Sequence, residues 1–236
     1  MPDNIAYVLI HSPLVGPLTW RPVYQEMTGR GIQAITPTLI DNSNSGIPFW
    51  TQHAESIAQN LRGLSLAYRL VLVGHSGAGP LLPVIRQFLN HPIEAYIFVD
   101  AGVPVNGLSR LDLMKSEDPD WAAPFEKTLL QGQLYPTWSA DDLQDIIPDK
   151  DLRDKLVAEI KPRSMAFFSE PIPVFDGWPD APCAYIKFSA AYDKVMERAR
   201  EAGWPVRELN AGHFHMLVNP AMVADMLLET IKELQN

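Results

Sequence analysis

Residues 70–79 read Leu-Val-Leu-Val-Gly-His-Ser-Gly-Ala-Gly, a short apolar run that ends in a cluster of glycines. The apolar run with its two valines predicts a buried strand, and the glycines predict a sharp turn. Residues 80–89 predict a helix whose prolines lie in its first turn, where backbone N–H groups have no helical partner. Strand, tight turn with a central serine, and helix form the context in which Gly-x-Ser-x-Gly is a nucleophile elbow. Ser76 is therefore a candidate nucleophile.

The glycines around Ser76 fit this interpretation with one departure. The elbow has room only for very small residues two positions on either side of the serine. Gly74 and Ala78 hold these positions, so one of them is not glycine but is still small. An ordinary strand-to-helix turn is the alternative interpretation. A phosphate loop is not indicated, because the Gly-Lys-Ser/Thr ending of that motif is missing.

The composition is that of an ordinary globular protein. The 236 residues are 47% hydrophobic and 20% charged, enough for one α/β domain with an insertion. The net charge of −9 and the lack of Lys/Arg-rich runs argue against nucleic-acid binding. Cys183, the single cysteine, cannot form an intramolecular disulfide. No basic segment precedes the first apolar run, which is too short for a signal peptide or membrane span, so we expect a cytoplasmic protein without a membrane partner.

Strands and helices alternate along most of the chain. Six apolar segments predict strands, namely residues 5–10, 32–36, 70–73, 95–99, 183–188 and 205–209. Because they are apolar almost throughout and are separated by helices, they predict an α/β fold with a mainly parallel sheet covered by helices on both faces. The alternation stops between residues 103 and 178, where short helices, prolines and tryptophans predominate. We interpret 103–178 as a helical cap inserted into a core formed by 1–102 and 179–236.

With the elbow at 74–79 and Gly212-His213-Phe214 before the last helix, the chain resembles the α/β-hydrolase fold superfamily over nearly its whole length. The resemblance implies a catalytic serine, acid and histidine, in that order along the chain. It also implies that the family's usual first antiparallel pair of strands is missing, since the strand at residue 5 corresponds to the family's third. No cofactor is implied.

The resemblance leaves two candidates for each partner of Ser76. His213 follows a glycine in the loop after the last strand and is favoured as the base, with His215 as the alternative. Asp193, after the penultimate strand, is favoured as the acid, although an aspartate before a helix is also a good N-cap. Asp100, at the end of the strand after the nucleophile, is the alternative acid. The histidines and carboxylates show no metal-ligand spacing, so no metal is expected.

The oxyanion hole departs from the family pattern. The resemblance assigns one donor to the backbone N–H of Gly77. The second should come from the loop after the first strand, but Pro13 in that loop has no N–H. Either Leu14 supplies the donor from a shifted loop, or the hole is incomplete.

The expected substrate pocket draws on this loop, the elbow and the aromatic residues of the insertion. The residues expected to line it are His11, Ser12, His75, Trp138 and Phe168. These aromatics favour a small, mostly apolar substrate, although most of the insertion's aromatic side chains could equally form its own small core.

The function expected from these features is hydrolysis of a small, mostly apolar carboxylic ester through an acyl-enzyme. A hydroxynitrile lyase or a carbon–carbon hydrolase could use the same three residues, because fold alone does not fix the chemistry. A ligand-binding protein with weak turnover is the alternative from another class, and Pro13 is its support. A small molecule is the only partner expected, and nothing in the sequence indicates an oligomeric state.

Overall fold

The computed structural model of the chain describes residues 4–235. Residues 1–3, which entered the expectation of an N-terminus without a targeting segment, lie outside the described residues, as does residue 236.

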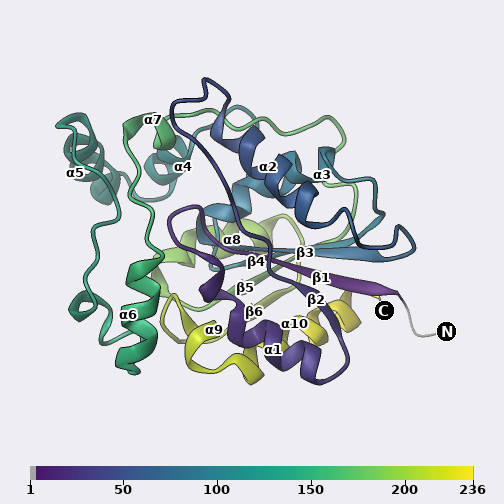
Figure 1. Cartoon of the computed structure of the whole chain (residues 1–236). Helices are drawn as coiled ribbons and strands as arrows, with labels where there is room; N and C mark the ends of the chain where they lie inside the picture. Colours follow the sequence, from purple (N-terminus) through teal and green to yellow (C-terminus); the bar gives the residue numbers. More distant parts are fainter. Residues whose placement is uncertain (1–3, 236) are drawn as a thin grey trace.

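One parallel sheet forms the centre of the molecule (Figure 1). Its strands are β1 (Ile5–Ile10), β2 (Gln33–Ile35), β3 (Arg69–His75), β4 (Ile93–Val99), β5 (Cys183–Lys187) and β6 (Val206–Glu208). They lie in the order β2-β1-β3-β4-β5-β6, and every neighbouring pair is parallel. The predicted six-stranded α/β fold is confirmed, and no antiparallel strand pair precedes β1 among residues 4–235.

Alternate residues of each central strand pack on opposite faces of the sheet. In β3, Leu70 and Leu72 belong to one hydrophobic core, whereas Val71 and Val73 belong to the other. This division follows from the two-residue period of a strand. It explains why the central strands are apolar throughout, because neither face meets water.

Helices cover both faces. The helices of the core are α1 (Arg21–Gly29), α2 (Phe49–Asn60), α3 (Leu82–Gln87), α8 (Asp193–Glu201), α9 (His215–Val218) and α10 (Pro220–Leu234). The apolar sides of α2, α3 and α8 pack with Leu70 and Leu72, and those of α1, α9 and α10 pack with Val71 and Val73. Figure 1 shows these two layers above and below the sheet. No helix within residues 4–235 is both long enough and apolar enough to cross a membrane.

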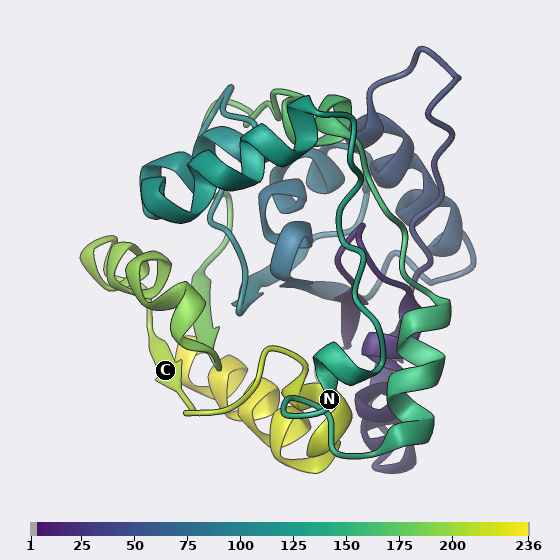
Figure 2. The ribbon, with the colours of Figure 1, turned by 90° about the vertical axis from the view of Figure 1, so that its left-hand side faces the viewer.

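The remaining helices lie between β4 and β5, in the segment interpreted as a cap. They are α4 (Arg110–Glu117), α5 (Pro119–Leu130), α6 (Lys150–Ala158) and α7 (Met165–Phe168). They gather at the end of the sheet where the strands terminate (Figures 1 and 2), and α6 packs against the 3-10 helix Pro17–Thr19 that precedes α1. The exact boundaries, 102/103 and 178/179, stay a prediction.

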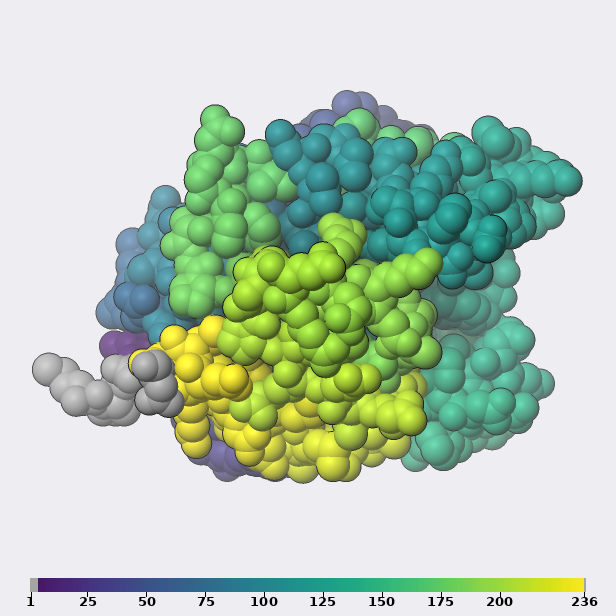
Figure 3. All heavy atoms as spheres, turned by 180° about the vertical axis from the view of Figure 1, so that it is seen from behind, coloured from purple at the N-terminus to yellow at the C-terminus, as the bar shows by residue number. Residues whose placement is uncertain are grey.

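On the side of the molecule that faces away from the viewer in Figure 1, α8 of the core contacts the insertion. In Figure 3 the segment that contains α8, in yellow-green, lies between the C-terminal helix below and the teal cap segment above. Arg198 of α8 bonds Glu117 of α4 at 2.9 Å. The insertion is therefore fastened to the sheet's helices on this side as well.

Candidate active site

Ser76 occupies the sharp turn at the end of β3. Its backbone φ is 55°, in the left-handed region that non-glycine residues rarely adopt. The chain turns so tightly that a Cβ on Gly74 would lie 3.2 Å from backbone atoms of Gly79, which explains the small residues of the motif. The helix expected at 80–89 begins instead as a 3-10 helix, Ser76–Leu81, and continues as the α-helix α3. This is the strand–turn–helix geometry expected of a nucleophile elbow.

Asp100, just after β4, is fully buried and also has a left-handed backbone, with φ 44°. Its Oδ1 accepts hydrogen bonds from the backbone N–H groups of Phe188 (2.8 Å) and Ser189 (3.0 Å). Its Oδ2 accepts from the Ser189 hydroxyl (2.6 Å) and lies 2.7 Å from Nδ1 of His213. Burial alone would raise the pKa of Asp100, but the hydrogen bonds from His213, Ser189 and Phe188 outweigh it and hold the pKa below the ordinary value. The carboxyl group is therefore ionised at neutral pH.

The Asp100 carboxylate fixes the tautomer of His213. An ionised carboxylate only accepts hydrogen bonds, so Nδ1 of His213 must carry the proton that it donates to Oδ2. In the neutral imidazole, Nε2 is then left with a lone pair that can accept a proton. This is the orientation that a general base for a serine requires.

The preference for Asp193 as the acid does not match this geometry. Asp193 is the first residue of α8, and its half-exposed carboxylate pairs with Lys187 at 2.5 Å. It neither meets His213 nor caps the helix, since Tyr192 is the N-cap residue. Asp100, the alternative weighed from the sequence, is the carboxylate that the structure brings to His213. The histidine preference agrees with the geometry, because His215 packs on the Phe188 ring and its buried Nε2 has no partner among residues 4–235.

Tyr192 connects the serine to the histidine. Its hydroxyl lies 3.2 Å from Oγ of Ser76, and its ring stacks on His213 at a centroid distance of 5.4 Å and an interplanar angle of 9°. Within the described part of the chain, Ser76 and His213 share no hydrogen bond, and the hydroxyl of Tyr192 is the side-chain partner of Ser76. Catalysis by this pair would require the Ser76 hydroxyl to turn from Tyr192 toward His213.

The loop after β1 lies against the elbow. A Cβ added to Gly77 would lie 3.2 Å from Oγ of Ser12 and 3.5 Å from Pro13, so the loop borders the residue after the nucleophile. Gly77 lies in the first turn of the 3-10 helix, where backbone N–H groups lack intrahelical partners. The N–H of Leu14 points to Oγ of Ser12 at 3.3 Å. Gly77 and Leu14, the two predicted oxyanion donors, thus border the same pocket.

Residues of the insertion bind this loop through the loop's own backbone carbonyl groups. Arg163 donates from Nη2 and Nε to the carbonyl oxygen of Pro13 (3.0 and 3.3 Å). The backbone N–H of Lys161 donates to the carbonyl oxygen of Leu14 at 2.9 Å. Pro13 therefore contributes no donor, but its carbonyl group is an anchor for the loop that carries the N–H of Leu14.

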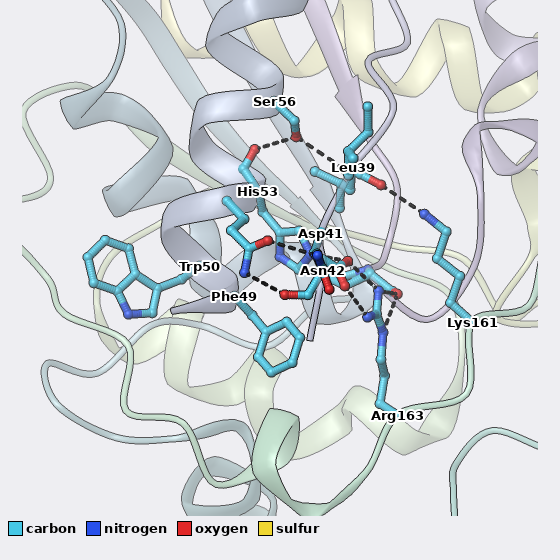
Figure 4. A network of polar contacts seen from close by, with 12 residues as sticks. Leu39, Asp41, Asn42, Phe49, Trp50, His53, Ser56, Lys161 and Arg163 are labelled. Carbon is cyan, nitrogen blue, oxygen red and sulfur yellow. Dashed lines mark hydrogen bonds and ion pairs between the residues drawn. The ribbon is translucent and has the colours of Figure 1, made fainter. Parts of the chain in front are cut away.

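Arg163 is itself fixed by a buried carboxylate (Figure 4). Asp41 accepts from both Nη atoms of Arg163 (2.6 and 2.7 Å) and lies 2.9 Å from Nε2 of His53. Burial would raise the pKa of Asp41, but the bonds from His53 and Arg163 outweigh it and lower the pKa. Lys161 adds a bond from Nζ to the carbonyl oxygen of Leu39 (2.8 Å). We call Arg163, Asp41, His53 and Lys161 the loop clamp.

A pocket opens at Ser76 between the core and the insertion. The residues that line it include Pro13, Leu14, Ser76, Gly77 and Tyr192 of the core, Arg110, Leu113, Met114 and Glu117 of α4, and Phe167 and Phe168 of α7. The pocket is open at its mouth, and the pocket and mouth together contain about 530 Å³ of empty space.

Of the five residues expected to line this pocket, only Phe168 does so. His11 is fully buried behind the loop, where Nδ1 donates to the carbonyl oxygen of Ser12 (2.9 Å) and Nε2 accepts from the N–H of Leu39 (3.2 Å). Ser12 is buried against the elbow and uses its hydroxyl for the N–H of Leu14. Both residues support the loop from beneath and do not face the pocket.

His75 and Trp138, which were also expected to line the pocket, do not line it either. His75 is fully buried, donates from Nε2 to the carbonyl oxygen of His213 (3.0 Å), and has its ring 4.4 Å from the His213 ring. Burial holds the pKa of His75 well below its ordinary value, so it packs as a neutral ring. Trp138 packs edge-on against Phe214 at 6.0 Å, in the core beneath the sheet.

Sequence reasoning missed Ser189, Tyr192 and Arg110. Ser189 and Tyr192 reach the site only because β5 lies beside β4, a neighbour relation that no local pattern shows. Arg110 had a usable signal. With Leu113, Met114 and Glu117 it follows the i, i+3, i+4, i+7 spacing of one helix face, in a helix that begins with a Ser109–Asp112 capping box.

Comparisons with known proteins agree with this fold. The model of the alpha/beta hydrolase family matches residues 7–226. A carbendazim hydrolyzing esterase from Nocardioides sp. (strain SG-4G) is 24% identical over 247 residues, which cover 94% of this chain and 97% of the esterase.

Among solved structures, an extracellular alpha/beta-hydrolase from a Paenibacillus species superposes with a TM-score of 0.77 at 17% identity, over 96% of this chain and 98% of its own. That structure is described as sharing structural and functional homology with tobacco salicylic acid binding protein 2. A pyrethroid hydrolase from Sphingobium faniae JZ-2 superposes with a TM-score of 0.70 at 16% identity, over 97% of this chain and 98% of its own. At such low identity these likenesses show the fold.

Proposed function

This chain belongs to the alpha/beta hydrolase family, and we propose that it is a serine hydrolase that cleaves a small, mostly apolar carboxylic ester through an acyl-enzyme. The observation that carries the proposal is the hydrogen bond between the buried Asp100 carboxylate and Nδ1 of His213, at the same edge of the sheet as Ser76. The esterase relative and the pyrethroid hydrolase support ester hydrolysis as the reaction class.

The proposed reaction begins when the Ser76 hydroxyl leaves Tyr192 and donates to Nε2 of His213. Oγ attacks the ester carbonyl carbon while His213 takes its proton. Asp100 stabilises the imidazolium that forms, and the negative charge on the carbonyl oxygen is stabilised by the N–H of Gly77. The N–H of Leu14 is the proposed second donor, after it releases Oγ of Ser12.

Collapse of the tetrahedral intermediate breaks the ester C–O bond, and the alcohol leaves with the proton from His213. Water then attacks the acyl-enzyme with His213 again as the base, which releases the acid and restores Ser76. The apolar walls formed by Leu113, Met114 and Phe168 suit a mostly apolar substrate.

A p-nitrophenyl ester series from acetate to octanoate tests the proposal. The wild type should hydrolyse at least one member, and Ser76→Ala should lose about 10⁴-fold or more in kcat/KM, because no nucleophile remains. A fluorophosphonate probe gives an independent readout, since it should modify the wild type at Ser76, as located by peptide mass spectrometry. A folded wild type that is neither active nor labelled would contradict the proposal and favour a ligand-binding protein.

A further inference from the structure

Arg110 places a buried positive charge in the wall of the pocket that contains Ser76. The residue is 5% exposed, and Nε, Nη1 and Nη2 all lack a hydrogen-bond partner among residues 4–235. A guanidinium group carries five N–H donors, and buried polar groups are nearly always hydrogen-bonded. Such a group is costly to keep in this state unless a partner from outside the chain completes it.

The neighbouring acidic groups do not supply that partner. Glu170 and Asp41 are the carboxylates whose charges act on Arg110. Glu170 accepts from the backbone N–H groups of Phe49 and Trp50 at the start of α2. Asp41 is bonded to Arg163 and His53 of the loop clamp.

The positive charge of Arg110 persists at neutral pH. Burial lowers the pKa of Arg110 to about 10, which still leaves it protonated. Its guanidinium carbon lies 4.1 Å from the centre of the Phe167 ring, which holds the group by a cation–π contact. Phe167 lines the same pocket, so the charged group lies at the pocket wall.

The face of α4 that lines the pocket arranges charge and apolar surface in a definite order. Arg110 lies at one end of this face, Leu113 and Met114 follow, and Glu117 lies two turns away. Glu117 is bonded to Arg198 at 2.9 Å, so its negative charge is already paired. Arg110 is therefore the unpaired charge of the pocket lining.

We propose that Arg110 is an anion-binding residue of this pocket, and that the substrate carries a free carboxylate in addition to its ester. The planar fork of a guanidinium matches the two oxygens of a carboxylate, which can accept two parallel hydrogen bonds from it. This inference rests on the proposed ester hydrolysis and narrows its substrate class. The carboxylate can belong to the acid part of the ester, as in a half-ester of a dicarboxylic acid, or to the alcohol part.

Matched esters that differ in the charged group test the inference. Monomethyl adipate and dimethyl adipate differ in a carboxylate on the acid side, and 4-acetoxybenzoate and its methyl ester differ in one on the alcohol side. For at least one pair, the wild type should prefer the anionic ester in kcat/KM. Arg110→Met should reduce the anionic-to-neutral ratio by about 10- to 100-fold, the range expected for hydrogen bonds to a charged group. The pair that responds identifies which part of the substrate carries the carboxylate.

Two further variants separate charge, shape and folding. Arg110→Lys keeps the charge without the fork and should give an intermediate ratio. Arg62→Met removes an exposed arginine of the same charge and should leave the ratio unchanged. Arg110→Met should melt close to the wild type, because it breaks no hydrogen bond and the removal of a buried charge offsets the lost cation–π contact with Phe167. If Arg110→Met does not fold, the anionic-to-neutral ratio of kcat/KM measured for Arg110→Lys tests the inference in its place.

Binding to Ser76→Ala, measured by calorimetry, separates this inference from the proposed function. Ser76→Ala should bind the favoured anionic ester more tightly than its neutral partner, and Ser76→Ala with Arg110→Met should lose that preference. Hydrolysis of both esters without a preference that depends on Arg110 would overturn the inference and leave the proposed function intact. Absence of hydrolysis together with binding that depends on Arg110 would contradict the proposed function alone.

Discussion

Asp100 and Asp193 both follow strands that end at the same edge of the sheet, yet their carboxylates meet different partners. Asp100 is fully buried and holds Nδ1 of His213, whereas Asp193 is half exposed and pairs with Lys187. Asp100→Asn should leave His213 in the wrong tautomer and lower kcat by up to about 10⁴-fold, by analogy with a serine protease. Asp193→Asn should change kcat by no more than a few-fold. Initial rates on the best p-nitrophenyl ester check both.

Thermal melting of both variants provides the control for this comparison. Asp100 accepts hydrogen bonds from Phe188 and Ser189 as well as from His213, so Asp100→Asn should also lower the melting temperature somewhat. The lower rate of Asp100→Asn supports a catalytic role for Asp100 only if this variant remains folded at the assay temperature. A folded Asp100→Asn with nearly full activity, together with a strongly impaired Asp193→Asn, would return the acid role to Asp193.

Among the elements, the loop after β1 and the insertion depend on each other. Arg163 anchors the carbonyl group of Pro13, and the N–H of Lys161 anchors that of Leu14. Arg163→Lys should lower kcat by about tenfold or more with a smaller change in KM, because one ammonium group cannot hold both Asp41 and Pro13 as the fork does. Loss of an oxyanion donor, which costs about 10²- to 10³-fold, sets the upper limit. Steady-state kinetics give the split between kcat and KM.

Lys161→Met is the matched control for Arg163→Lys. It removes the bond from Nζ to Leu39 but keeps the backbone N–H that holds Leu14, so its effect on kcat should be smaller. A variant Arg163→Lys that keeps the wild-type kcat but melts at a lower temperature would show that the loop clamp stabilises the fold without positioning the donor.

At the scale of the whole molecule, the sequence predicted what depends on local pattern and order along the chain. The apolar strands predicted the parallel sheet with two covered faces, and the glycines around Ser76 predicted the turn that exposes it. Local sequence patterns could not predict which side chains the site residues contact. The choice of Asp100 over Asp193 depends on the order of β4, β5 and β6 in the sheet, and on which side chains then meet across it. Arg110 and Arg163 approach the pocket only after the insertion folds back over the core.

The whole molecule should also become less stable in weak acid, because it buries neutral histidines. Burial lowers the pKa of His11 and of His53 from 6.5 to about 4, and that of His75 well below 6.5. Below about pH 6.5 the unfolded chain binds protons that the folded chain excludes, so the free energy of unfolding falls as the pH falls toward about 4. Asp100 and Asp41 change the stability only at lower pH. Folding lowers their pKa values, so the stability that they contribute is lost only as the pH falls below the ordinary pKa range of a carboxyl group.

His11 offers the clearest test of this pH dependence. Between about pH 7 and about pH 5 it should contribute about 2 kcal/mol to the loss of stability, at 1.36 kcal/mol per pH unit below about 6.5. His11→Gln should therefore be less stable at the higher pH but should lose about 2 kcal/mol less on acidification, as measured by urea unfolding. Thr19→Val, which removes another fully buried polar group but no titrating one, should lower stability equally at both pH values. If His11→Gln showed the same acid loss as the wild type, His11 would have to take up its proton within the folded state, against the bonds that now hold it neutral between Ser12 and Leu39.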